Sequence, residues 1–177
     1  KRQPERDLLL FVAEEQPSGS GRVYAEGGDA YQMANLVLDV AEKFGCRRIY
    51  TSGAAVSQTH HDARPRVWAV ATDREVLGEA RRQANTVPMS EAEDRGDLGS
   101  ITGLNGLLIG AARKRGFEGM CLMGEIPDYL SRVPFPYPQA SRSVLEVLAA
   151  LLSIDIDYRA LDEMTERADA LLAAVGG

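Results

Sequence analysis

Hydroxyl, amide and acidic side chains follow several of the strands that the sequence predicts, and these residues are the best suited to chemistry. In open α/β sheets, ligands bind beyond the carboxyl ends of the parallel strands. We therefore expect any ligand site of this chain to be built from such strand ends and from one glycine-rich helix start. The candidate ligand-binding residues are Ser52, Gly53, Thr102, Gly103, Asn105 and Glu125.

Glu125 is the strongest acid candidate, because it directly follows a buried apolar strand. A carboxylate in that position can have a raised pKa and act as a general acid, or accept a sugar hydroxyl. The alternative is structural: Glu125 caps a helix or pairs with an arginine such as Arg132 or Arg142. We favour the structural interpretation, because ion pairs that hold a fold together also perturb acids.

The segment Thr102–Gly103–Leu104–Asn105–Gly106 opens a predicted helix and has two interpretations. Its free N–H groups could hold an anion. Alternatively, small residues let the helix pack closely against the sheet. Neither GxGxxG nor Walker spacing is present, so we favour packing, with Asn105 as a local cap.

His60 and His61 are the two histidines of the chain and are adjacent, with Asp62 beside them. Side chains of adjacent residues diverge in most backbones, and the helical or CxxC spacing of zinc sites is missing. A serine hydrolase would have to recruit one of these histidines without a G-x-S-x-G elbow. We therefore expect no catalytic residue, no metal and no cofactor.

Charge and composition exclude some partners. The chain has 177 residues, a formal net charge of −6 and a pI of about 5.0. Nucleic acids and anionic membrane surfaces both require a basic face, so neither is expected as a partner. Cys121 lies in an apolar run, Cys46 is the second of two cysteines, and no stretch approaches the ~20 apolar residues of a membrane span. Together these features indicate a reduced, cytoplasmic protein.

The hydrophobic pattern predicts a single α/β domain over residues 1–177, with helices flanking a largely parallel sheet. Strands are predicted at residues 7–13, 48–51, 66–72 and 119–124, and helices begin near Asp29, Thr72, Leu104, Ser141 and Asp157. The orientation of the strand at 66–72 stays open, since its connection is too polar for a convincing helix. Because no helix precedes the strand at residue 7, we expect that part of the fold lies upstream.

The last predicted helix carries a narrow apolar stripe on a charged background. Its members are Leu161, Met164, Ala168, Leu171 and Val175. Most such helices cover a core, but a stripe near heptad spacing also suits a partner subunit. We treat these residues as a candidate oligomer interface.

Two segments at a specific spacing resemble the proteasome assembly chaperone family. They are Gly99–Leu108 (GSITGLNGLL) and Cys121–Glu125 (CLMGE), and the resemblance continues through Pro138–Ser141 to Ile154–Asp157. The resemblance runs from about Asp7 to Leu161. It implies a three-layer α/β fold similar to nucleoside phosphorylases, homo-oligomers, and ATP-independent binding of proteasome subunits without agreed catalytic residues.

The sequence departs from this family at both ends. The family has a strand and a glycine-rich turn upstream of residue 7, and archaeal members often end in a hydrophobic residue, tyrosine and any residue. This chain ends Ala174–Val–Gly–Gly177. Our first hypothesis is a non-catalytic homo-oligomeric assembly factor that binds protein subunits, possibly of proteasome type. The alternative is a phosphorylase- or hydrolase-like enzyme that acts on a small anionic or nucleoside-like ligand at the strand ends.

Overall fold

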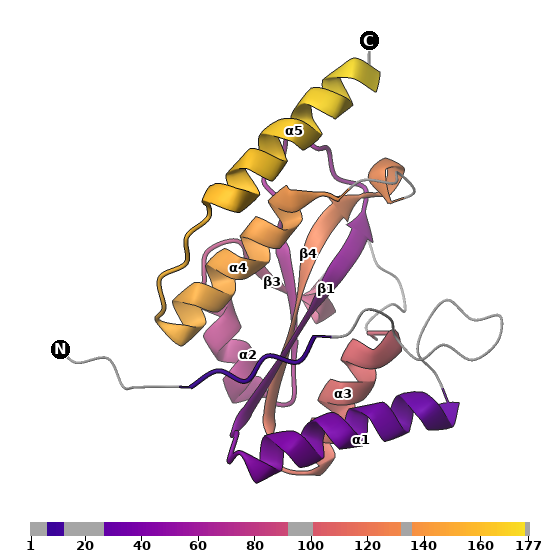
Figure 1. The fold of residues 1–177 in the computed structure, drawn as a ribbon, viewed down its shortest axis with the longest axis vertical. Helices are drawn as coiled ribbons and strands as arrows, with labels where there is room; N and C mark the ends of the chain where they lie inside the picture. Colours follow the sequence, from indigo (N-terminus) through magenta and orange to yellow (C-terminus); the bar gives the residue numbers. More distant parts are fainter. Residues whose placement is uncertain (1–6, 13–26, 92–100, 132–135, 176–177) are drawn as a thin grey trace. The chain divides into compact units, whose positions relative to one another are not determined.

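The computed structural model describes residues 7–12, 27–91, 101–131 and 136–175 (Figure 1). The helices are α1 (Gly27–Lys43), α2 (Arg74–Arg81), α3 (Gly103–Lys114), α4 (Pro138–Leu152) and α5 (Arg159–Val175). The strands are β1 (Arg48–Ser57), β2 (Val67–Ala71), β3 (Thr86–Pro88) and β4 (Glu118–Pro127), with short 3₁₀ turns at Met89–Glu91 and Asp128–Leu130. The predicted α/β class is confirmed. None of the described helices is long and apolar enough to cross a membrane.

The four strands form one sheet in the order β1-β4-β2-β3. β2 and β3 are parallel, with Val67 opposite Thr86. β2 and β4 run in opposite directions, because Thr72 bonds to Gly119 at one end and Glu125 to Arg66 at the other. β1 and β4 are parallel, because Arg48 bonds to Glu118 at their starts and Ser57 bonds to Glu125 toward their ends. The sheet is therefore mixed, and the strand whose orientation the sequence left open is antiparallel to its neighbour β4.

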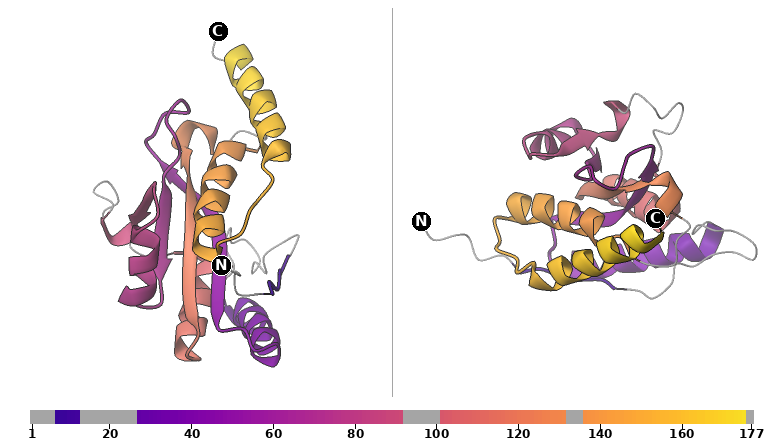
Figure 2. Two further views of the ribbon diagram at one scale, coloured as in Figure 1. Left: turned by 90° about the vertical axis from the view of Figure 1, so that its left-hand side faces the viewer. Right: turned by 90° about the horizontal axis from the view of Figure 1, so that it is seen from above.

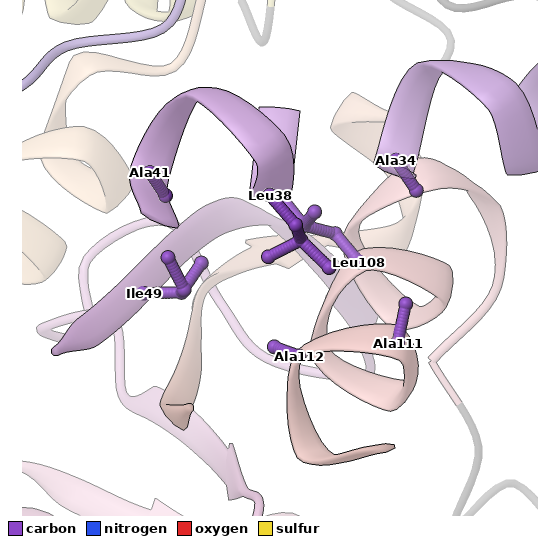
Figure 3. Close-up of a cluster of buried hydrophobic side chains, with 7 residues drawn as sticks. All are labelled: Ala34, Leu38, Ala41, Ile49, Leu108, Ala111 and Ala112. Atoms are coloured by element: carbon purple, nitrogen blue, oxygen red, sulfur yellow. The ribbon is translucent and has the colours of Figure 1, made fainter. Parts of the chain in front are cut away.

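The chain forms two compact units, the first made of Lys1–Thr51, Val70–Leu77 and Ala92–Cys121. Its core is a cluster in which α1 and α3 pack on the start of β1 (Figure 3). The buried members are Ala34, Leu38, Ala41, Ile49, Leu108, Ala111 and Ala112. Alanines at the helix contact leave room for the larger Leu38, which is fully buried. Figure 3 shows Leu38 directed toward Leu108 of α3.

The second unit comprises Ser52–Ala69, Gly78–Glu91 and Leu122–Gly177, and contains α4 and α5. Ala168 of α5 is buried, and Gln139 at the start of α4 donates to Asp169 (3.0 Å). α4 lies close to β4, because a Cβ added at Gly124 would come within 2.7 Å of the Ala140 carbonyl oxygen. Figure 2 shows α4 beside β4.

The structure differs from the sequence-based expectation at three places. Residues 7–12 form no strand, and Leu8 to Val12 are exposed, because a continuous apolar run is buried only when another strand or helix covers it. β3 was missed, since three residues ending in a proline give no strand pattern. The helix predicted to begin near Thr72 is capped by Asp73, which accepts from the N–H groups of Glu75 and Val76. The Thr72 hydroxyl instead accepts from the N–H of Gly119.

Candidate functional site

Glu125 lies inside β4 and is almost completely buried, with 1% of its surface exposed. Ser57 donates to its Oε1 (2.7 Å), and the Arg66 N–H donates to its Oε2 (3.1 Å). The Arg66 guanidinium adds two more hydrogen bonds, Nη2 to Oε1 (2.8 Å) and Nε to Oε2 (3.1 Å). Both carboxylate oxygens are thus held by protein donors.

These bonds set the ionisation of Glu125. Burial disfavours the charged form, but hydrogen bonds from Arg66 and Ser57 outweigh it and bring the pKa of Glu125 below its ordinary value of 4.5. A general acid needs the opposite shift, toward neutral pH. Glu125 is therefore an ionised structural carboxylate at neutral pH.

Glu125 also joins the two ends of one connection. Ser57 is the last residue of β1, and Arg66 immediately precedes β2, so one carboxylate fastens both ends of the segment 58–65. We call this segment the β1–β2 loop. Its sequence is polar, but the loop is firmly anchored.

The middle of the β1–β2 loop is held through His61. The Tyr129 hydroxyl lies 2.7 Å from His61 Nδ1 and accepts from the His61 N–H (2.8 Å). The Tyr137 hydroxyl donates to the His61 carbonyl (3.2 Å). Burial, aided by nearby negative groups, raises the pKa of Tyr137 to about 12, so this hydroxyl remains a donor.

The end of the loop lies against α4 and α5 at a charged groove of about 340 Å³. Arg64 donates to Glu146 (2.7 Å), and Arg142 bridges Glu146 (3.1 Å) and Asp162. Burial of Glu146 opposes its ionisation, but the hydrogen bonds from Arg142 and Arg64 prevail and lower its pKa. Carboxylates and guanidinium groups of the groove thus largely neutralise one another.

Three of the candidate ligand-binding residues do not lie at the ends of strands, where they were expected. β1 continues to Ser57, so Ser52 and Gly53 lie within the strand, and Glu125 lies within β4. Ser52 and Gly53 suggested a strand end by their residue types, and Glu125 did so because it follows the apolar run at residues 119–124. The predicted pairing of Glu125 with an arginine is confirmed, but the partner is Arg66. Arg142 bonds to Glu146 and Asp162, and Arg132 lies outside the described residues.

The helix-start candidates lie in the first unit. Thr102 and Gly103 line an open hollow of about 730 Å³ with Gly27, Gly28 and Tyr31, and Asn105 is half-buried in α3. Gly103 has a φ of +76°, which only glycine adopts easily. A Cβ at Gly106 would lie 2.0 Å from the Ile101 carbonyl oxygen. These two glycines therefore serve the backbone conformation at the start of α3, and the contact of Gly106 is with the preceding residues and not with the sheet.

The functional residues that the sequence analysis missed are Ser57 and Arg66. No local signal marks them, since both are ordinary polar residues flanking a loop. Their role depends on which strands become neighbours: Arg66 lies 59 positions from Glu125 in the sequence. The order of strands in the sheet would have been needed to find them.

The candidate oligomer interface on α5 is partly covered. Ala168 is buried and Leu161 is half-buried, whereas Met164 and Leu171 are 40% and 51% exposed. Val175 is the last residue of the helix, and its side chain lies outside the described part. Because Gln139 is the second residue of α4 and contacts Asp169, the last turns of α5 extend beyond the start of α4 (Figure 1).

Comparison with known proteins decides the family. The family model described as the PAC2 family matches residues 1–175. The chain belongs to the PAC2 family. An uncharacterized protein of Methanocaldococcus jannaschii is 28% identical over 142 residues, which cover 80% of this PAC2 chain and 48% of that protein. The chain thus spans about half the length of this curated relative.

Solved structures share the fold of this PAC2 chain. PbaB of Pyrococcus furiosus, described as an archaeal proteasome activator, has a TM-score of 0.69 at 25% identity, covering 88% of this chain and 63% of PbaB. PbaA of the same organism, described as an archaeal homolog of proteasome-assembly chaperone, has a TM-score of 0.63 at 21% identity, covering 81% and 57%. A PAC2 family protein from Streptomyces avermitilis has a TM-score of 0.64 at 21% identity, covering 82% and 56%. The predicted family resemblance is confirmed.

Proposed function

We propose that this chain is a non-catalytic, assembly-chaperone-like protein that binds protein subunits as a homo-oligomer. The observation that carries the proposal is the environment of Glu125. The strand-end acid that the enzyme hypothesis required has both oxygens bonded to Ser57 and Arg66 and a lowered pKa. A carboxylate held in this way stabilises a fold and has no free oxygen for a substrate.

The surface of α5 supports binding to another protein. Met164 and Leu171 expose large apolar side chains on either side of the buried Ala168. The helix continues past the start of α4, so Leu171 lies where α4 gives no cover. Burying such residues against another subunit would stabilise the complex by about 25 cal/mol for each Å² of apolar surface removed from water.

Proteasome-type subunits are the partners that we propose for this chain. PbaB, a structural relative at 25% identity, is described as an archaeal proteasome activator. PbaA, which shares the fold, is described as an archaeal homolog of proteasome-assembly chaperone. The net charge of −6 supports protein partners over nucleic acid, and we expect the complex to form in the cytoplasm.

Native mass spectrometry of the protein, purified gently from its own cells, tests the proposal. We expect a homo-oligomer with co-purifying protein subunits, whose masses identify the client. A bare oligomer that carries a stoichiometric small molecule would contradict the proposal and favour the enzyme. The matched sample is the Leu171→Asp variant, in which the homo-oligomer should dissociate.

A further inference from the structure

His60, His61 and Asp62 come together in a tight turn at the middle of the β1–β2 loop. The Ala63 N–H donates to the His60 carbonyl (3.0 Å), which closes the turn. The two imidazole rings do not diverge: their centroids are 4.2 Å apart, and their planes are tilted by only 30°. The reason for expecting no metal at adjacent histidines therefore does not hold in this structure.

The nitrogen and oxygen atoms of the three side chains face one another. His60 Nδ1 lies 3.2 Å from one Asp62 oxygen, and His61 Nε2 lies 3.6 Å from the other. One ligand atom from each of the three residues lies within 4.8 Å of the others. Ligands about 2.0–2.1 Å from a tetrahedral zinc ion are about 3.3 Å apart, which is close to the separations of 3.2 and 3.6 Å between Asp62 and the two histidines.

Tyr129 supplies the support that a metal-bound histidine needs. Histidine ligands usually donate their second ring N–H to an oxygen, which fixes the ring and leaves the first nitrogen free for the metal. His61 Nδ1 lies 2.7 Å from the Tyr129 hydroxyl. In the tautomer in which Nδ1 carries the proton, Nε2 presents its lone pair on the side of Asp62.

The loop is also held in place before any ion binds. Glu125 anchors both its ends, the Arg64–Glu146 pair holds it against α4, and Tyr137 bonds to the His61 carbonyl. His60 and Asp62 themselves remain accessible, with 63% and 81% of their side chains exposed. A preorganised, accessible set of ligands binds an ion at a small conformational cost.

We propose that His60, His61 and Asp62 bind a divalent transition-metal ion of the zinc type. Two imidazoles and one carboxylate suit zinc and neighbouring metals rather than calcium or magnesium, which prefer oxygen ligands. Three protein ligands leave a fourth position for water, as in open zinc sites. The site lies in the second unit and does not depend on the proposed chaperone function.

Zinc competition with a chromophoric indicator, on chelator-treated protein without a histidine tag, tests the site. We expect one zinc ion per chain, with an affinity at least about 10-fold lower in His60→Ala and Asp62→Asn. Tyr129→Phe should weaken binding by about 10-fold because it removes only the support of His61. Asp155→Asn, at another exposed aspartate, and Cys46→Ser, which removes a thiol, should leave zinc binding unchanged.

Cobalt binding gives a second readout that does not depend on affinity. Cobalt held by imidazole and carboxylate lacks the intense charge-transfer absorption that a thiolate ligand gives. We therefore expect cobalt-loaded protein without this absorption band. The proposal is overturned if the folded protein binds no zinc, if Asp62→Asn binds as tightly as the parent, or if Cys46→Ser abolishes binding. Far-ultraviolet circular dichroism confirms that each variant is folded, and His60 and Asp62 are exposed enough for their replacement to be tolerated.

Discussion

Arg66 donates to both carboxylate oxygens of Glu125, with Nη2 2.8 Å from Oε1 and Nε 3.1 Å from Oε2. The carboxylate is buried, whereas the arginine side chain is 48% exposed and also lies over the Trp68 ring at 4.6 Å. The pair thus connects a buried position of β4 to the surface. It is one of several contacts that hold the β1–β2 loop.

Replacing Glu125 by alanine should destabilise the protein by about 2–4 kcal/mol, because Ser57 and the Arg66 N–H lose their buried acceptor. The exposed part of the guanidinium regains water, which limits the loss. Urea unfolding measures the effect. Glu118→Ala is the matched control on the same strand: it removes the exposed pair with Arg48 and should cost less than about 1 kcal/mol. Equal losses in the two variants would show that Glu125 is not an anchor.

Lowering the pH should reduce the free energy of unfolding, because Glu125 becomes protonated. The pKa of Glu125 is lowered in the folded state, so the unfolded chain takes up its proton at a higher pH. The resulting stabilisation is complete above the ordinary value of 4.5 and is lost as the pH falls through the lower, folded-state value. Urea unfolding of the parent and of Glu125→Gln at a series of pH values measures this. The stability difference between them should shrink below about pH 4.5, and a constant difference would contradict the assignment.

Gly106→Ala should destabilise the first unit by at least about 2 kcal/mol, because the added methyl group would lie 2.0 Å from the Ile101 carbonyl oxygen. Gly110→Ala on the same helix is the control. A Cβ there meets nothing within 4 Å, so it should stabilise the protein by about 0.5–1 kcal/mol. Thermal melts of both variants measure the change in stability. A Gly106→Ala protein as stable as the parent would disprove the close approach of Gly106 to the Ile101 carbonyl oxygen.

Leu171→Asp should dissociate the proposed oligomer, because it places a charge at the centre of an apolar interface. Light scattering coupled to size-exclusion chromatography gives the mass in solution. Ala170→Asp adds the same charge at the neighbouring exposed position, which points away from the Leu171 face by about 100°. The control should keep the parent mass, and an unchanged mass for Leu171→Asp would exclude this face.

Local patterns in the sequence predicted the helices well and the site poorly. Leucines and alanines at helical spacing predict α3, and Gly116, with a φ of +80°, follows the end of that helix. The apolar run Leu8–Val12 has the same local character as a buried strand, yet burial depends on what covers it. Likewise, Glu125 was correctly expected to pair with an arginine. Its partner could not be named, because the register between β2 and β4 is set by the whole sheet and not by neighbouring residues.

The strand order has a consequence for how the chain folds. β1 and β2 are consecutive in the sequence, but β4 lies between them in the sheet. β1 and β2 therefore do not pair with each other, and each needs β4, which is synthesised later, as its neighbour. Contacts between distant parts of a chain form slowly, because the entropy cost of closing the loop comes before the stabilising contacts form. We expect the helical contact of α1 with α3 to form early, and the arrival of β4 to limit the rate of folding.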